Sequence, residues 1–423
     1  MMSRPTRLMT LTAVLALVAA ACGGDTSETT TTVASETTST VPGETTTTAL
    51  SDDGSEPEGD PIIIGAAIDQ TQDMAPFNNP ANLASQIMVD RINADGGVLG
   101  RPLELITLDA TVDADLNKST AIDLIEQGAE ILVVTCDFDF AAPAIQEALA
   151  ADILAVAPCI GTDRMGPLGL GEPGRTAFSF GNQGQDEGAV MAEFALDQGW
   201  ENAVVVKDNL IVYFQDVVDA FDTRYTENGG NVVATEEFVG FDGTISNVVT
   251  AVAGMEKDVI AISTAFADLP AFVFGLRSLG DDTPIICSWS CDGTFWYQEG
   301  ESLNNFYYNT FVSVFGDDPD PDVNEFIAEM TERGGAPATG GFLGGAQMIQ
   351  ALAEGIETTG GTNADDLAAF LEGFDNKTLI MGEVSLDADN HTVFGRPHRI
   401  MVVTDSTPAF LETRVATSPA DIR

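Results

Sequence analysis

Short apolar strands alternate with helices along most of this chain, and this alternation limits the folds open to it. The segment 61–68 is a short, apolar, β-branched run that predicts a buried strand. The helix predicted next, 80–95, carries apolar residues on one face and ends at Gly96 and Gly97. Further strands are predicted at 103–109, 130–135 and 153–157, with helices at 118–127 and 141–150. Because these strands are continuous apolar runs, we expect a parallel sheet covered by helices on both faces.

The same rhythm restarts after residue 180 and predicts a second unit of similar plan. Its strands are expected at 203–207, 231–238, 259–263 and 284–288, and its helices at 214–227, 245–255 and 270–279. Helices at 321–333, 342–358 and 364–372 follow, and strands near 382–386 and 399–403 complete the pattern. The predicted fold class is therefore α/β, with two doubly wound parallel-sheet lobes. Ligands bind beyond the carboxyl ends of such strands, so two facing sheets predict a cleft.

The start of the chain has a different character. Two arginines precede a largely apolar run from Leu8 to Ala21, which is the pattern of a secretory signal peptide. Cys22 directly follows three alanines and resembles the acylated cysteine of a bacterial lipoprotein. We expect a signal peptide at 1–21, and at 22–60 a lipidated cysteine with a disordered, Thr-rich tether. This arrangement anchors the protein outside the cytoplasm, on the outer face of the bacterial cell membrane; an ordinary signal peptide with a cysteine near the cut is the alternative.

Composition and missing motifs exclude several classes of function. The chain has 17 basic and 66 acidic residues and a formal charge of −49, which excludes nucleic acid as a partner because such binding needs a basic surface. There is no nucleophile elbow, no zinc spacing and no phosphate-binding loop. The two histidines, His391 and His398, are predicted to be surface or loop residues. We therefore expect no catalytic residues, no metal and no cofactor, and so not an enzyme.

The cysteines suggest an oxidising compartment. If Cys22 is acylated, four others remain, and they allow three pairings. We favour Cys136–Cys159, because both lie at the ends of consecutive predicted strands, and Cys287–Cys291, which closes a small loop. Free buried thiols are the alternative for both pairs.

Several segments resemble one known family. Residues 64–65 and 90–105 are similar to the first strand, the first helix and the second strand of the type I periplasmic binding proteins, specifically the branched-chain amino-acid binding proteins of ABC importers. Residues 277–280 resemble the matching piece of the second lobe, and 341–354 resemble the long helix of the first lobe. The resemblance covers about residues 61–415.

That resemblance implies a hinged trap, often called a Venus flytrap, in which three crossover strands join the two lobes. The crossings are expected near 178–181, 309–315 and 376–382. Each lobe is then discontinuous: lobe 1 is expected to comprise 61–179 and 313–377, and lobe 2 to comprise 180–312 and 378–423. Closure over a ligand distinguishes the loaded protein from the empty one, because a ligand bridges both lobes only when they are shut.

The resemblance also implies which residues contact the ligand. From lobe 1 they are Phe77, Asp137, Phe138, Cys159, Gly161 and Thr162, and from lobe 2 they are Tyr213 and Asp268. Trp289 or Phe295 is a further candidate for an apolar wall. The alternatives are that Asp268 caps its helix and that the aromatic residues belong to the core. Thr162 lies one residue beyond the hydroxyl position usual in the family.

Asp137 departs from the family pattern, because it occupies a position where relatives have a hydroxyl. A carboxylate there would repel a ligand carboxylate by about 1–4 kcal/mol at a separation of about 4 Å. Either Asp137 points away, or the ligand is not a plain α-amino acid. Together with Asp139 and Asp268, it favours a ligand with a positive or hydrogen-bond-donating group, such as a basic amino acid, an amide, an amine or a urea-like compound.

The expected function is that of a monomeric, lipid-anchored solute-binding protein. It would capture a small polar ligand, amino-acid-like or an amide, between its lobes and deliver it to an ABC import permease. A sensory protein that uses the same trap to signal to a membrane receptor is the alternative.

Overall fold

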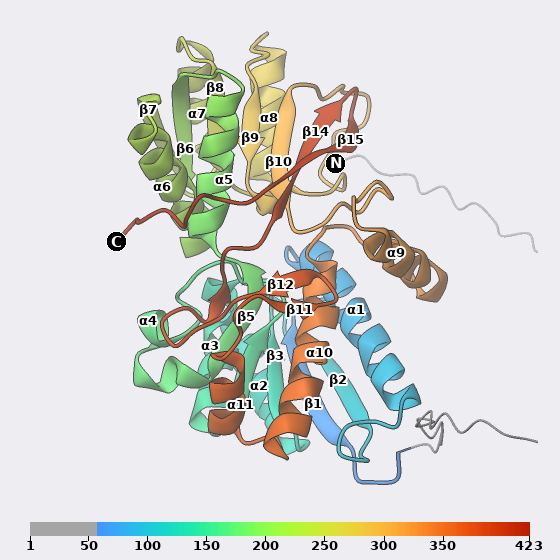
Figure 1. The fold of residues 1–423 in the computed structure, drawn as a ribbon. Helices are drawn as coiled ribbons and strands as arrows, with labels where there is room; N and C mark the ends of the chain where they lie inside the picture. Colours follow the sequence, from blue (N-terminus) through green and yellow to red (C-terminus); the bar gives the residue numbers. More distant parts are fainter. Residues whose placement is uncertain (1–56) are drawn as a thin grey trace, which may run out of the picture. The chain divides into compact units, whose positions relative to one another are not determined.

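The fold consists of two α/β lobes, each built around its own sheet (Figure 1). The computed structural model describes residues 57–423. The predicted signal peptide, Cys22 and most of the predicted tether therefore lie outside the described residues. Within residues 57–423, no helix is both long enough and apolar enough to cross a membrane.

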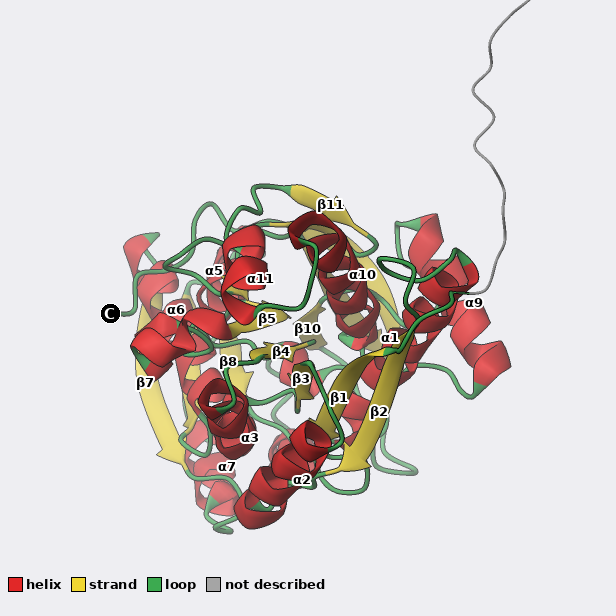
Figure 2. Cartoon of the chain, turned by 90° about the horizontal axis from the view of Figure 1, so that it is seen from below, coloured by secondary structure: helices red, strands yellow, loops and turns green. Residues whose placement is uncertain are grey.

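The first lobe contains a six-stranded parallel sheet with the order β13-β5-β4-β3-β1-β2. Its strands are β1 (Ile62–Ile68), β2 (Leu103–Asp109), β3 (Ile131–Val134), β4 (Leu154–Ala157), β5 (Ala177–Asn182) and β13 (Thr392–Val393). Its helices are α1 (Ala75–Ala94), α2 (Ala114–Glu126), α3 (Phe138–Ala150), α4 (Pro167–Leu170), α10 (Phe342–Thr359) and α11 (Ala364–Leu371). Figure 2 shows α2 and α3 on one face of this sheet and α1, α10 and α11 on the other.

The second lobe contains a seven-stranded sheet with the order β15-β14-β10-β9-β8-β6-β7. Its strands are β6 (Asn202–Asp208), β7 (Asn231–Phe238), β8 (Val259–Ser263), β9 (Ile285–Cys287), β10 (Phe306–Thr310), β14 (His398–Thr404) and β15 (Thr407–Arg414). Its helices are α5 (Gly184–Asp197), α6 (Val212–Glu227), α7 (Ile245–Ala253) and α8 (Asp268–Ser278). The strands from β7 to β10 are parallel, and the antiparallel strands β14 and β15 complete the sheet. The predicted α/β fold with two doubly wound lobes is confirmed.

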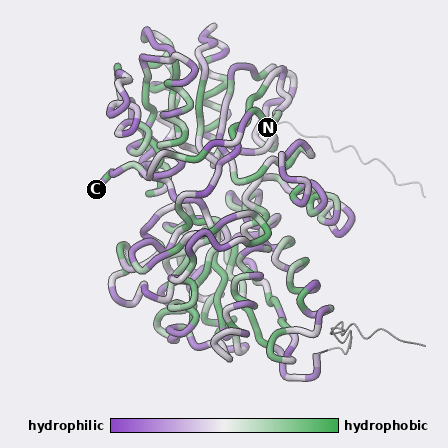
Figure 3. Tube along the Cα trace, viewed as in Figure 1, coloured by the Kyte–Doolittle hydropathy of each residue, from purple (hydrophilic) through white to green (hydrophobic). Residues whose placement is uncertain are grey.

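The strands form because their apolar side chains are buried on both faces. Every residue of β3, β4 and β8 is buried, as continuous apolar runs predict for sheets covered on both sides. Hydrophobic segments follow the strands and the inner faces of the helices, whereas hydrophilic segments follow the outer loops (Figure 3). In the first lobe, α10 comes so close to α1 that a Cβ atom on Gly345 would clash with the carbonyl oxygen of Ala81. Only glycine permits this approach.

Three segments connect the lobes within the described residues. The chain leaves β5 at Asn182 for α5, leaves β10 at Thr310 toward α9 (Pro321–Arg333) and α10, and passes from β13 to β14 across residues 394–397. The last position corrects the predicted crossing at 376–382. Residues 378–393 belong to the first lobe rather than to lobe 2, because β13 pairs with β5 and places Thr392 opposite Ser179. The other two predicted lobe boundaries, between residues 179 and 180 and between 312 and 313, remain predictions.

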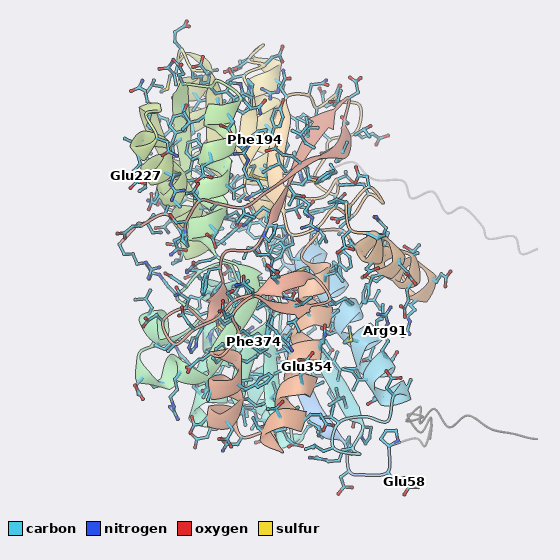
Figure 4. All side chains as sticks on the ribbon, viewed as in Figure 1. Glu58, Arg91, Phe194, Glu227, Glu354 and Phe374 are labelled. Carbon is cyan, nitrogen blue, oxygen red and sulfur yellow. A yellow bond between two sulfur atoms is a disulfide. The ribbon has the colours of Figure 1, made fainter. Side chains whose placement is uncertain are left out.

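The hairpin of β11 (Lys377–Leu379) and β12 (Gly382–Val384) lies within that corrected segment. Its apolar side chains, among them Leu379, Met381 and Val384, are buried in the core of the first lobe. Outside the sheets, α9 packs on α1. Figure 4 labels Arg91 on α1. This arginine pairs with Glu329 of α9, and its guanidinium carbon lies 4.9 Å from the ring centroid of Phe326.

Candidate ligand-binding site

A small cavity lies between the loops that follow the carboxyl ends of parallel strands in both sheets, where ligands of such folds bind. Its lining consists of Met74, Phe77, Cys136, Asp137, Ile211, Tyr213, Phe214, Ala265, Phe266, Trp289 and Ser290. The first four come from the first lobe and the others from the second. The space open to the centre of a water-sized sphere is about 20 Å³, roughly the room that a single water molecule needs.

Aromatic rings form most of the cavity wall. Phe77, in the first turn of α1, meets Trp289 across the two lobes with ring centroids 5.2 Å apart and ring planes at 72°. Phe214 of α6 lies 6.4 Å from Phe266, which follows β8. Edge-to-face and tilted contacts of this kind stabilise aromatic clusters. The wall is therefore predominantly apolar, with rings supplied by both lobes.

Asp137 supplies the only carboxyl group among the residues that line the cavity. It is the N-cap of α3, and its carboxylate accepts a hydrogen bond from the amide of Phe140 at 3.1 Å. Burial and, to a smaller extent, the neighbouring carboxylate of Asp139 together raise the pKa of Asp137 to about 7, against the lowering effect of the helix amides. Among the described residues, no Lys, Arg or His lines this cavity.

Glu187 positions two of the lining residues, although it does not line the cavity itself. Its Oε2 accepts a hydrogen bond from the Tyr213 hydroxyl at 2.6 Å, and its Oε1 accepts one from the Trp289 amide at 2.6 Å. The side chain lies near the start of α5 and is buried, which raises the pKa of Glu187 to about 7. Nothing in the sequence marks Glu187 as a site residue, because no motif surrounds it and its partners are distant in the chain.

Three of the eight predicted ligand residues, Phe77, Asp137 and Tyr213, line the cavity. Gly161 lies behind it, where a Cβ atom would approach the Tyr213 ring to 2.6 Å, so glycine is needed for the two lobes to meet there. Trp289 also lines the cavity, whereas Phe295 is half exposed outside it and packs against Phe77 at 5.9 Å.

The remaining four predicted residues lie outside the cavity, because each has another partner. The Thr162 hydroxyl donates to Asp216 of α6 at 2.6 Å, and Cys159 is buried in a disulfide. Phe138 packs against the apolar cluster between the first sheet and helices α2 and α3. Asp268 is the first residue of α8, and its carboxylate accepts a hydrogen bond from the amide of Phe241 at 2.8 Å rather than facing the cavity.

Two further acids make polar contacts between the lobes, Asp139 next to the cavity lining and Asp163 outside it. Asp139 of α3 accepts a hydrogen bond from the amide of Val212 at the start of α6, at 2.8 Å. Asp163, in the loop after β4, pairs with Arg423, whose guanidinium also lies 3.8 Å from Asp216 of α6. The walls of the cavity are therefore held against each other by polar contacts between the lobes.

The crossing segments contain buried polar side chains. Nδ1 of His398 lies 3.4 Å from Nδ2 of both Asn182 and Asn309. Asn182 ends β5, His398 begins β14 and Asn309 is the penultimate residue of β10, so all three lie beside a crossing. His391 is also buried and stacks on Phe178 at a centroid distance of 3.9 Å. The prediction of surface or loop histidines was therefore wrong for His398, which is buried in strand β14, whereas His391 lies in a loop but is buried. Burial, together with Arg396 and Arg399, lowers the pKa of His398 to about 3, so this side chain stays neutral.

Both predicted disulfides are confirmed. Cys136 and Cys159 join the ends of β3 and β4 with Cα atoms 4.9 Å apart, and Cys287 and Cys291 are joined at 6.1 Å. Both separations lie in the usual range for disulfides. Among the residues that the structure describes, no group of three or more His, Cys, Asp or Glu side chains is arranged to hold a metal ion.

Comparison with known proteins decides the family. The sequence model of the family described as periplasmic binding protein matches residues 61–408. The chain belongs to the periplasmic binding protein family. Its fold matches that of the type I periplasmic binding proteins.

Relatives of this periplasmic binding protein are distant in sequence. The Leu/Ile/Val-binding protein BraC3 of Rhizobium johnstonii is 22% identical over 309 residues, which are 73% of this chain and 82% of BraC3. The substrate-binding protein LivJ of Streptococcus pneumoniae, solved with isoleucine, has a TM-score of 0.73 at 19% identity and covers 84% of this chain and 99% of its own. A solute-binding protein of Rhodopseudomonas palustris, solved with 3,4-dihydroxybenzoic acid, has a TM-score of 0.73 at 17% identity, with coverages of 85% and 99%.

Proposed function

We propose that this periplasmic binding protein captures a small amino-acid-like ligand between its two lobes and, from a lipid anchor on Cys22, delivers it to an ABC import permease. The observation that carries the proposal is the cavity, whose walls combine Phe77 and Asp137 of one lobe with Tyr213 and Trp289 of the other. A ligand at that place contacts both lobes at once, so it favours the state in which they meet. The isoleucine bound to LivJ and the dihydroxybenzoic acid bound to the R. palustris protein support a small ligand.

Ligand entry requires the lobes to separate. The cavity has room for roughly one water molecule, and its walls come from two lobes that only three segments connect. Movement about these segments, near Asn182, Thr310 and residues 394–397, would open the site without unfolding either sheet. Both walls come from one chain, so a monomer is sufficient for binding. Each residue named in the proposal has a binding role, and none has a catalytic role.

A melting-temperature panel tests the binding function. Valine, leucine, lysine, small amides, amines and benzoate are added separately to the full chain, and a ligand at 100 times its Kd should stabilise it by about 2.7 kcal/mol. Phe77→Ala should abolish the shift, because Phe77 lines the cavity, whereas Phe315→Ala should keep it, because Phe315 is exposed and lies outside the cavity. A folded wild-type protein that responds to no compound would contradict the proposal. Cellular uptake of the ligand that depends on this protein would distinguish import from signalling to a receptor.

The anchor is tested separately, since Cys22 lies outside the described residues. Replacing Cys22 with alanine should abolish incorporation of a labelled fatty acid and move the protein from the membrane fraction to the soluble fraction. The variants Cys136→Ala and Cys159→Ala serve as controls, because these cysteines form a disulfide inside the first lobe and should not carry lipid. A Cys22→Ala protein that stays in the membrane fraction would disprove the lipid anchor.

A further inference from the structure

We infer that the cavity takes a small organic cation with an apolar body, such as an alkylammonium ion, and disfavours a ligand that carries a carboxylate. This inference rests on the proposed function and names the chemical class of its ligand. It follows from how the helix ends, the charged side chains and the aromatic rings are arranged around the cavity.

The helix ends beside the cavity already have anionic partners from this chain. Backbone amides at helix N-termini favour anions, and a ligand carboxylate would be expected to bind there. At α3, however, the carboxylate of Asp137 accepts the amide of Phe140 at 3.1 Å. At α6, the carboxylate of Asp139 accepts the amide of Val212 at 2.8 Å. A ligand carboxylate would therefore meet two carboxylates where it needs free amides.

The charge and the aromatic character of the side chains that line the cavity favour a cation as ligand. Asp137 brings a buried carboxyl group whose charged form a bound cation would stabilise, and no Lys, Arg or His among the described residues lines the cavity to compete with that cation. Five aromatic side chains complete the wall: Phe77, Tyr213, Phe214, Phe266 and Trp289. Aromatic faces attract cations through their quadrupole, most strongly where water is excluded. The hydroxyl of Tyr213 donates to the buried carboxyl group of Glu187, which lies behind that ring.

One hydrogen-bond donor in the lining lacks a partner. The indole nitrogen Nε1 of Trp289 is buried and has no hydrogen-bond partner among the described residues. Buried polar atoms of this kind usually find a partner. The ring carbons Cε2 and Cζ2 next to this nitrogen lie against Gly341, where an added Cβ atom would approach them to 3.1 and 2.4 Å. A single neutral N–H group on that edge of the ring does not offset the charge of a carboxylate that faces Asp137.

Three matched compounds separate the charges of an amino acid. Isobutylammonium is valine without its carboxylate, and 3-methylbutanoate is valine without its ammonium group. Calorimetric titration of the full chain should give the tightest binding for isobutylammonium, weaker binding for valine and none for 3-methylbutanoate. Tighter binding of valine or of 3-methylbutanoate would overturn the inference while supporting the proposed function. If none of the three binds, the inference fails, and the wider panel decides separately whether the chain binds a ligand at all.

The variant Asp137→Asn tests the group that recognises the cation. Asparagine is as good an N-cap as aspartate, so α3 keeps its cap while the charge is lost. Affinity for isobutylammonium should fall at least tenfold. The matched control is Asp268→Asn, since Asp268 is also a buried acid near the start of a helix but lies outside the cavity; its affinity should stay within twofold. Equal losses in the two variants, or no loss in Asp137→Asn, would overturn the inference.

Discussion

The full chain should melt at a higher temperature at pH 5.5 than at pH 8. Four buried carboxyl groups are responsible, and burial is the largest cause of each shift. It raises the pKa values of Asp137 and Glu187 to about 7 and those of Asp186 and Asp292 to about 6. In the unfolded chain the same groups titrate near pH 4. Between about pH 4 and pH 7 the folded protein therefore holds protons that the unfolded chain has released.

The direction of the effect follows from this difference in bound protons. When the folded state binds more protons, the free energy of unfolding falls as pH rises. The stability is fully present below the unfolded pKa values and is lost as pH passes the folded values near 6 and 7. One pKa unit corresponds to about 1.4 kcal/mol, so four groups raised by about two units or more change the free energy of unfolding by several kcal/mol. Repulsion within a chain of formal charge −49 acts in the same direction.

Melting curves between pH 5 and 8 at constant ionic strength measure this effect. Asp137→Asn should flatten the slope, because an uncharged N-cap replaces a carboxyl group that titrates in this window. Asp109→Asn is the control. Hydrogen bonds from Thr71 and from the amides of Gln70 and Thr111 lower the pKa of Asp109 despite the effect of burial, so it titrates below the window. A melting temperature that rises between pH 5.5 and pH 8 would show that these buried groups do not control stability.

The sheets were the part of the fold that sequence predicted best. The strand predicted at 103–109 is β2, and the strand predicted at 259–263 is β8, with the same bounds. A buried parallel strand is specified by its own apolar residues, so a local pattern is enough to find it. The same holds for Cys136 and Cys159. They follow strands β3 and β4, which are neighbours in one sheet, so the two cysteines lie close enough to form a disulfide.

The features that the sequence did not predict depend on contacts between residues that are far apart along the chain. Strand β13 has only two residues and forms because it pairs with β5, more than 200 positions earlier. Glu187 acquires its role from Tyr213, 26 positions away, and from Trp289, 102 positions away. Asp268 was predicted from the family resemblance, but a matching position along the chain does not determine where a carboxylate points. In the structure, the Asp268 carboxylate accepts a hydrogen bond from the amide of Phe241 instead of facing the cavity.

Removal of the Cys136–Cys159 disulfide should destabilise the first lobe by about 3 kcal/mol, because the bond closes a loop of 23 residues in the unfolded chain. The Cys287–Cys291 disulfide closes a loop of only 4 residues, so its removal should cost about 2 kcal/mol in the same treatment. Both pairs are buried, and alanine is the suitable replacement because it leaves no unpaired polar atom.

Urea unfolding of the two double-alanine variants compares the losses directly. The variant without Cys136 and Cys159 should unfold at the lower urea concentration, and it should also lose ligand affinity, because Cys136 lines the cavity and the bond fixes the loop that carries Asp137. The variant without Cys287 and Cys291 should lose less stability. An equal or larger loss in that second variant would mean that loop length does not determine how much each disulfide stabilises the protein. The packing of Cys291 in the core of the second lobe would then determine it.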